Sequence, residues 1–294
     1  MLFANCHNHS TFSDGVWSPE ELVDLAVKVG HKALILTDHD TVRGTYFLAK
    51  AARRAGLLSL LGCEFGTVGP AGENVHLLGF DFNPDNQKMK ELLAYTSGRQ
   101  TTRSHLMFDF GLERGKLRGG ITWQDVLDDH PYHDYFCNNQ VFVSMVKRGI
   151  YQKTEYNEFY CGSFATHKDP AVKAMIKEKL KMPAPAMTDV IDIIKDAGGV
   201  PVVAHPNGFV GKAAEWVEQY GVMGFEVIHP DLTAEESVFF DRFCDERHLY
   251  KMGGTDHSSL LGGFYTTMPE HDLPPECGYV RESDFMKLYR REFG

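Results

Sequence analysis

Histidine and carboxylate side chains recur in this sequence at the ends of short apolar segments. His7 and His9 close the segment "LFANCHNH", and their i, i+2 spacing places both imidazoles on the same face of a strand. Residues of the same two types end or lie within later segments: His39, Glu64, His76, His205, Glu226, Asp256 and His257. Imidazoles and carboxylates are ligands of divalent first-row metal ions, so the pattern indicates a metal site.

Two carboxylates stand out by their surroundings. Glu64 follows the apolar run "LSLLGC", where an ionised side chain is costly unless it is paired or coordinated. We therefore expect Glu64 to bridge two ions. Asp14 lies in the loop after His9 and is either a further ligand or part of an Asx turn in "SDG".

These residues can bind the same metal ions only if the strands that carry them end close together. Apolar runs separated by turn residues predict strands near 2–9, 32–39, 58–66 and 74–82, and from residue 187 onward helices and strands alternate again. About seven strands alternating with helices predict a parallel sheet with helices outside, either open or closed into a barrel. In a barrel, the carboxyl ends of all strands meet at one rim, where such folds build their sites.

The intervening helices carry start and stop signals. Ser18, Pro19 and Glu21 predict a helix that begins with a capping box, and Gly30 predicts its end. The stretch 84–185 differs, because it shows amphipathic helical patterns and little strand. It is predicted to be a mostly helical insertion.

The motifs that carry these residues resemble those of a known family. They are "HNHSTFSDG", "LILTDHDTVRG", "GCEF", "VHLLGF", "GGVPVVAHP" and a late "GGTDH". As a set they are similar to the PHP (polymerase and histidinol phosphatase) family of metal-dependent phosphoesterases, in the amidohydrolase superfamily. The resemblance implies an α/β fold, a distorted (β/α)7 TIM-like barrel built from residues 1–83 and 186–294, with 84–185 as a mostly helical cap.

The resemblance also implies a site for two or three divalent ions of Mn, Fe or Zn. Carried over position by position, the implied ligands are His7, His9, Asp14, His39, Glu64, His76, His205 and Asp256. The family pattern near the last strand is Asp-x-His, whereas this chain reads Asp256-His257-Ser258. His257 is therefore either a ligand reached from a loop or a side chain turned to the opposite strand face. A second departure is "CNNQ" at 137–140, where related small-molecule phosphatases often carry an Arg-x-His run.

These residue types suit the hydrolysis of a phosphate ester. Two close ions would lower the pKa of a bridging water, and the resulting hydroxide would attack phosphorus in line. The leaving oxygen needs a proton, for which His229 and His257 are candidates, although His229 could instead be a structural turn histidine. Asp38 is expected to orient ligating histidines. The candidates for substrate contacts, each with a plain structural role or a solvated surface charge as its alternative, are Arg43, Arg103, Arg148, Lys168 and Asn139.

The composition limits the classes of molecule that the chain is expected to bind and the compartment in which it is expected to lie. The chain of 294 residues has 30 basic and 40 acidic side chains and a net charge of −10, so nucleic acid is an unfavourable partner. The cysteines are scattered without a C-x-x-C pair, and the N-terminus lacks a signal-peptide pattern. No apolar run reaches about 18 residues. We therefore expect a cytoplasmic chain without a membrane span.

Three functions remain in view at this point. The first is a hydrolase acting on phosphoric ester bonds of a small phosphorylated metabolite: a nucleotide, a sugar phosphate or a cyclic phosphodiester. The second is a 3′–5′ exonuclease-type PHP domain acting on nucleic acid. The third is a non-catalytic metal-binding scaffold, which the shift at Asp256-His257-Ser258 would favour. The sequence leaves the oligomeric state open.

Overall fold

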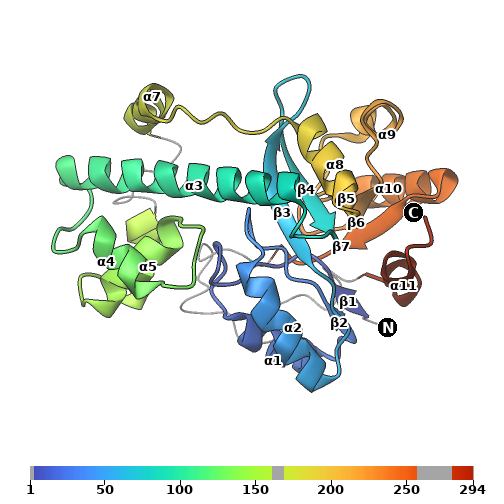
Figure 1. The fold of residues 1–294 in the computed structure, drawn as a ribbon, viewed down its shortest axis with the longest axis horizontal. Coiled ribbons are helices and arrows are strands. Elements are labelled where there is room, and N and C mark those ends of the chain that lie inside the picture. The colour runs from blue at the N-terminus through green and yellow to red at the C-terminus, as the bar shows by residue number, and fades with distance from the viewer. Residues whose placement is uncertain (1–2, 161–168, 257–279, 294) are drawn as a thin grey trace.

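The computed structural model describes residues 3–160, 169–256 and 280–293 (Figure 1). Its strands are β1 (Ala4–Asn5), β2 (Ala33–Leu34), β3 (Gly62–Val68), β4 (Asn74–Phe80), β5 (Val200–Val203), β6 (Gly224–Ile228) and β7 (Tyr250–Gly253). Its α-helices are α1 (Pro19–Val29), α2 (Arg43–Ala55), α3 (Gln87–Glu113), α4 (Trp123–Asp129), α5 (Asn138–Lys147), α6 (Tyr156–Glu158), α7 (Pro170–Lys179), α8 (Met187–Asp196), α9 (Ala213–Tyr220), α10 (Ala234–Arg247) and α11 (Glu282–Arg290). The α/β fold is confirmed.

The strands form a parallel pair, β1-β2, and a five-stranded sheet in the order β3-β4-β5-β6-β7. Strands β5, β6 and β7 are parallel, but β4 is antiparallel to both of its neighbours. The prediction of an all-parallel sheet is therefore wrong at β4. The physical reason is the short connection after β3: residues 69–73 can form a turn but cannot hold the crossover helix that a parallel pair needs.

The regular ladders do not close into a barrel. The strands predicted over 2–9 and 32–39 pair as a ladder only at β1 and β2. Backbone hydrogen bonds outside the regular ladders nevertheless join the two sheets at both edges. At one edge the Asp40 N–H donates to the Glu64 carbonyl at 2.8 Å, and at the other the Asp256 N–H donates to the His7 carbonyl at 2.9 Å. Segments that carry candidate ligands are thereby held side by side.

Local signals explain the helix that follows β1. The Ser18 hydroxyl accepts from the Glu21 N–H at 3.2 Å, and the Glu21 carboxylate accepts from the Ser18 N–H at 2.8 Å. Gly30 ends α1 with a φ of +90°, a backbone conformation that side-chain-bearing residues adopt at a cost. The predicted capping box and helix end are both confirmed.

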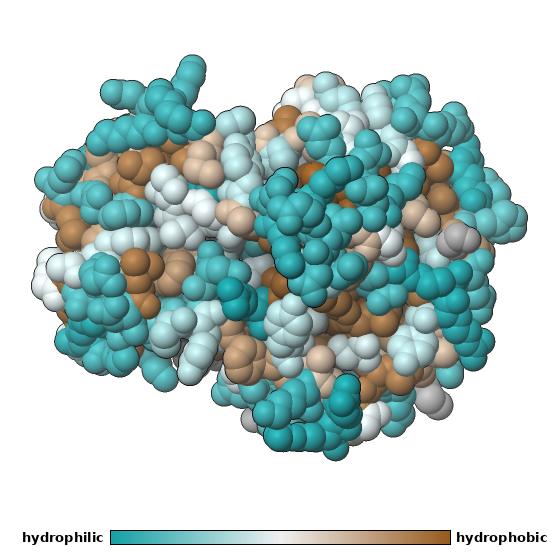
Figure 2. Space-filling model, viewed as in Figure 1, coloured by the Kyte–Doolittle hydropathy of each residue, from teal (hydrophilic) through white to brown (hydrophobic). Residues whose placement is uncertain are grey.

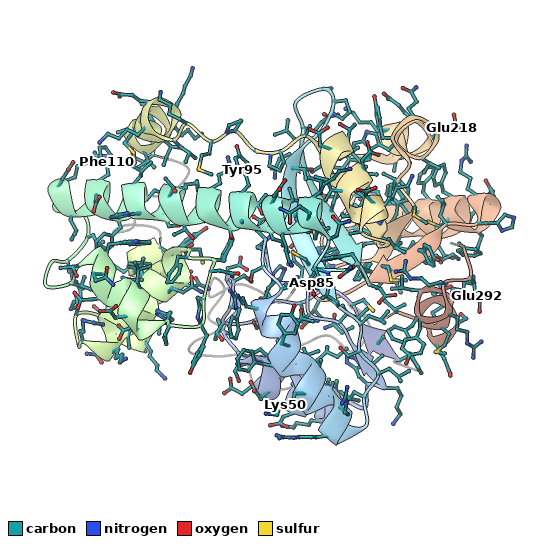
Figure 3. All side chains as sticks on the ribbon, viewed as in Figure 1. Lys50, Asp85, Tyr95, Phe110, Glu218 and Glu292 are labelled. Atoms are coloured by element: carbon teal, nitrogen blue, oxygen red, sulfur yellow. The ribbon has the colours of Figure 1, made fainter. Side chains whose placement is uncertain are left out.

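Two hydrophobic clusters bury different sets of helices. One packs α8, α9 and α10 against the sheet and includes Trp216 and Phe225. The other lies within 84–185 and includes Phe108, Phe142 and Tyr151. Helix α3 connects the two: Figure 3 shows Tyr95 near the sheet and Phe110 at the far end of this helix. The described residues between 84 and 185 are mostly helical, and the assignment of this stretch as a helical insertion or cap stays a prediction.

The face of the molecule drawn in Figure 2 is mostly hydrophilic, with smaller hydrophobic areas between the polar side chains. Among the helices in the described part of the chain, none has both the length and the apolar character needed to cross a membrane.

Candidate metal centre

Glu64 lies at the centre of a cluster of imidazoles. Its side chain is 1% exposed. The ring nitrogens nearest to its two carboxylate oxygens are His76 Nδ1 at 2.8 Å, His9 Nε2 at 3.0 Å, His7 Nε2 at 3.1 Å, His205 Nε2 at 3.1 Å and His39 Nδ1 at 3.4 Å. These histidines follow β1, β2 and β5 or lie in β4, so the structure brings together residues that are up to 198 positions apart (205 minus 7).

Two further carboxylates, those of Asp256 and Asp14, lie in this cluster. Asp256 Oδ1 lies 3.1 Å from His9 Nε2. Asp14 lies 3.5 Å from His9 Nδ1 and 3.9 Å from His39 Nε2. The predicted ligands in the described residues therefore all lie in one cluster.

Glu226 has a different position, on the outer side of His7. Its Oε1 lies 3.0 Å from His7 Nδ1, and its Oε2 accepts from the His205 N–H at 2.6 Å. A carboxylate on the second ring nitrogen orients a ligating imidazole and fixes its tautomer. The sequence placed Glu226 within a predicted strand, but this positioning role was missed, because only the fold shows which histidine it faces.

The contacts in the cluster fit metal ligands better than hydrogen-bonded partners. His9 Nε2 is buried and makes no hydrogen bond of acceptable geometry, although it lies 3.0 Å from a Glu64 oxygen. His7, His76 and His205 do meet hydrogen-bond geometry with Glu64. A carboxylate has about four acceptor sites, however, and five imidazoles converge on this one, as ligands around shared ions would. The possible ligand atoms form four groups, and within each group they lie within 4.8 Å of one another. Two groups contain Glu64, namely His7-His9-Glu64-Asp256 and His39-Glu64-His76, and the other two are His9-Asp14-His39 and His7-Glu226-His229.

The electrostatics of the cluster favour cations. Although burial lowers the pKa of His9, the carboxylates of Asp256, Glu64 and Asp14 outweigh it and raise that pKa to about 10. Burial alone would raise the pKa of Glu64, but the neighbouring imidazoles hold it well below its usual value. Divalent cations compete with protons for such a site.

The backbone is held in unusual conformations around the cluster. Asp40, His205 and Asp256 have φ angles of +53°, +29° and +45°. Each such residue costs about 1–3 kcal/mol, and this kind of strain is concentrated at functional sites. Gly254 adds a close approach, because a Cβ there would clash with the backbone of His7.

The contacts of the Asp38 carboxylate differ from the prediction that this residue orients ligating histidines. Its carboxylate accepts hydrogen bonds from the Ser10 N–H and hydroxyl, both at 2.7 Å, and from the Ser13 hydroxyl at 2.6 Å. Asp38 therefore holds the loop that carries Asp14. A Cβ at position 44 would clash with this carboxylate, which explains Gly44 at the start of α2.

The change Asp38→Asn is expected to destabilise this loop. An amide offers one acceptor oxygen where three donors now converge, so at least one buried donor is left unpaired. We expect the free energy of unfolding to fall by about 2–3 kcal/mol, measured by urea denaturation, while Asp24→Asn on the exposed face of α1 leaves it unchanged. Equal stability of the two variants would contradict the loop-holding role.

The segment at 137–140 also has a structural role. Gln140 Nε2 donates to the Thr11 carbonyl at 2.9 Å and to the Ser13 carbonyl at 2.6 Å, and Asn139 Nδ2 donates to the Asp14 carbonyl. Asn139 is 4% exposed. The proposed substrate contact at Asn139 is therefore corrected: its amide ties the insertion to the Asp14 loop.

Two of the remaining substrate candidates, Arg148 and Arg43, pair with carboxylates. Arg148 ends α5 and pairs with Asp125 and Asp129, at the opposite end of the helix from Asn139. This contradicts its predicted contact with substrate. Arg43 is 59% exposed and pairs with Asp134 at 3.1 Å. His257 and Lys168 lie outside the described residues.

His229 does lie in the cluster. Its Nε2 is buried, 3.6 Å from Asp256 Oδ2 and 4.0 Å from Glu226 Oε2. On its other side, Nδ1 accepts from the Asp231 N–H at 3.1 Å. That bond assigns the ring hydrogen of the neutral imidazole to Nε2, which faces the carboxylates.

Comparison with known proteins places the chain among phosphoesterases. Residues 5–144 match the family model of the PHP domain. A 5′-3′ exoribonuclease of Salmonella typhimurium is 29% identical over 265 residues, 85% of this chain and 83% of the relative. A 3′,5′-nucleoside bisphosphate phosphatase of Chromobacterium violaceum is 25% identical, with 94% of each chain covered. The structure of a Bifidobacterium adolescentis protein, assigned as a metal-dependent phosphoesterase, superposes with a TM-score of 0.74 at 26% identity, covering 99% of this chain and 96% of that one.

These relatives change one expectation. The net charge alone made nucleic acid an unfavourable partner, but a relative named as an exoribonuclease removes the support for excluding it. Local cations and bound metal ions decide contact with phosphates, and the total charge of a chain does not report them.

Proposed function

This chain belongs to the PHP family of metal-dependent phosphoesterases, and on that premise we propose that its substrate is a small phosphorylated metabolite, a nucleotide or a sugar phosphate. The observation that supports this proposal is the buried Glu64 carboxylate with five imidazole nitrogens within 3.4 Å of its oxygens. A site of this kind suits hydrolysis of phosphate esters, where catalysis is mainly positioning and electrostatics.

We assign the ligands to two or three divalent ions of Mn, Fe or Zn. His7, His9 and Asp256 would hold one ion together with Glu64, and His39 with His76 would hold another, also with Glu64. His205 and Asp14 complete the set. Such ions, when bound, lower the pKa of a water molecule and neutralise charge on phosphate oxygens.

The chain's own residues supply orientation and a proton. Glu226 holds the His7 ring through Nδ1, which leaves Nε2 directed at Glu64. His229 holds a hydrogen at Nε2 and is proposed to donate it in a hydrogen bond to the leaving oxygen. Its Nδ1 is occupied by the Asp231 N–H, so the ring cannot rotate without losing that bond.

The finer architecture is proposed on the same footing. The backbone bonds at Asp40–Glu64 and Asp256–His7 support a distorted, barrel-like arrangement of residues 1–83 and 186–294. The separate hydrophobic cluster in 84–185 supports a cap. In this arrangement the cap, through Gln140, stabilises the loop that carries Asp14.

A second candidate function is hydrolysis of RNA from an end. It is favoured by the exoribonuclease relative, which matches 85% of this chain. It differs from the first candidate in the length of the substrate and in the ester that is hydrolysed, which is a phosphodiester in RNA and a phosphomonoester in a nucleotide or sugar phosphate.

Phosphate release with defined metals tests the proposed function. Protein dialysed against a chelator is expected to lose activity, and added Mn²⁺ is expected to restore it on mononucleotides more than on RNA oligonucleotides. Malachite-green detection of phosphate and gel analysis of RNA measure the two arms. Restoration only on RNA would favour the second candidate, and no metal-dependent release from any ester would contradict both.

A further inference from the structure

The first turn of α5 is bonded to the loop that carries Asp14. Gln140 Nε2 donates to the Thr11 carbonyl at 2.9 Å and to the Ser13 carbonyl at 2.6 Å. The Oε1 atom of the same side chain accepts from the Cys137 N–H at 2.8 Å, a bond that caps α5. Gln140 is buried, and both donors and the acceptor of its amide are engaged. One side chain therefore joins the start of this helix to two carbonyls of the loop.

Asn139 adds a bond to the candidate ligand residue itself. Its Nδ2 donates to the Asp14 carbonyl, and its Oδ1 accepts from the Tyr156 hydroxyl at 2.8 Å. Tyr156 is buried in the hydrophobic cluster that lies within 84–185, so the amide of Asn139 is held from behind by that cluster. Asn139 and Gln140 together are named the α5 clamp.

The clamp holds Asp14 by its backbone, whereas the Asp14 carboxylate faces the imidazoles. One carboxylate oxygen lies 3.5 Å from His9 Nδ1 and the other 3.9 Å from His39 Nε2. These three residues form a group that could hold one ion, and Asp14 supplies its carboxylate. Glu64 and Asp256, in contrast, are placed by the sheet, because Glu64 lies in β3 and Asp256 follows β7. The clamp therefore acts on one part of the ligand set.

We propose that the α5 clamp sets how tightly the ion at His9, Asp14 and His39 is bound, and that this ion in turn fixes α5 against the loop. Breaking the clamp leaves buried carbonyls without a donor, so the loop has one favoured position while the clamp is formed. If that position is the one in which Asp14 reaches the ion, the ion stabilises the clamp by the same free energy. This inference rests on the metal assignment in the proposed function and deepens it: Asn139 and Gln140 are positioning residues for one ion.

A metal titration tests the effect of the clamp on the ion. Chelator-treated protein is titrated with MnCl2 in a calorimeter, without substrate. Gln140→Met keeps the length of the side chain but has no donor, and we expect it to weaken one class of site about tenfold and to leave the others unchanged. Gln124→Met, on the exposed side of α4, is the matched control and should bind as the wild type does. Equal affinities in Gln140→Met and wild type, or an equal weakening of all sites, would overturn the proposal.

A double-mutant cycle shows whether the effect passes through Asp14. Asp14→Asn removes the carboxylate that the clamp positions, so Gln140→Met is expected to have little further effect on Mn²⁺ binding in that background. Residues that act independently give additive losses. The same loss in both backgrounds, with circular dichroism showing that every variant is folded, would contradict the inference.

Hydrogen exchange tests the reciprocal effect with α5 unaltered. In the wild type, Mn²⁺ is expected to slow exchange of the α5 amides about tenfold, and Asp14→Asn is expected to remove that protection. The amides of α10, which packs in the other hydrophobic cluster, should respond alike in both proteins. Exchange in α5 that does not respond to Mn²⁺, or protection that persists in Asp14→Asn, would overturn the proposal.

These measurements separate the inference from the proposed function, because none of them uses turnover. If no phosphate ester is hydrolysed, the proposed function fails, while the titration and the exchange rates still decide whether the clamp controls the ion. If esters are hydrolysed but Gln140→Met binds Mn²⁺ as the wild type does, the proposed function stands and this inference fails.

Discussion

The change Glu64→Gln is expected to remove bound metal and to lower phosphoesterase activity by at least about a thousandfold. Glutamine has nearly the same shape but no charge, and it can accept through only one oxygen. Both oxygens of Glu64 are in use: His76 and His205 face one, while His7 and His9 face the other. An uncharged bridge would leave two neighbouring cations without the anion that offsets their repulsion.

Metal content and activity should be measured together for this variant. Inductively coupled plasma mass spectrometry after dialysis gives the ions per chain, and p-nitrophenyl phosphate gives the rate. Glu20→Gln, exposed in the first turn of α1, is the matched control. Glu64→Asp keeps the charge and shortens the reach, and it should keep part of the metal. A folded Glu64→Gln protein with full metal content would contradict the bridging assignment.

The change His229→Asn is expected to slow hydrolysis of esters with poor leaving groups by about a hundredfold to a thousandfold. Asparagine can place an acceptor where Nδ1 now accepts from the Asp231 N–H, but it cannot reach the position of Nε2. A leaving alkoxide depends on that donor, whereas p-nitrophenolate is a stable anion without it. Ribose 5-phosphate and p-nitrophenyl phosphate should therefore respond differently.

His229→Gln provides the matched comparison, because its longer side chain carries an N–H close to the place of Nε2. We expect it to recover part of the rate on ribose 5-phosphate. Metal analysis accompanies both variants, since His229 also lies near His7 and Glu226 in a group that could hold an ion. Loss of metal in His229→Asn, or an equal loss on both esters, would show that the residue does not serve the leaving group.

The loop at 10–15 shows how far local sequence reasoning reaches. The sequence placed Asp14 there and left open whether it is a ligand or part of an Asx turn. In the structure the loop is held from outside itself, by Asp38 and by Gln140. No pattern within the loop predicts Gln140, a partner more than a hundred residues away, and none predicts that the Asp38 carboxylate bonds to Ser10 and Ser13.

Arg148 was a candidate phosphate contact because it is a cation. It pairs with Asp125 and Asp129. Charge can be read from a sequence, but the counter-ion of a given charge cannot.

The sequence by itself determined the donor set, the alternation of strands and helices and the limits of α1, because residue types, hydrophobic periodicity and capping boxes act over a few neighbouring positions. The tertiary structure decided the rest: the reversed direction of β4, the convergence of five imidazoles on Glu64, and the position of Glu226 behind His7. The physical reason is the distance along the chain between the groups that interact. Turns and caps are satisfied by near neighbours, whereas a buried carboxylate is satisfied by whichever groups the packing of distant segments brings to it.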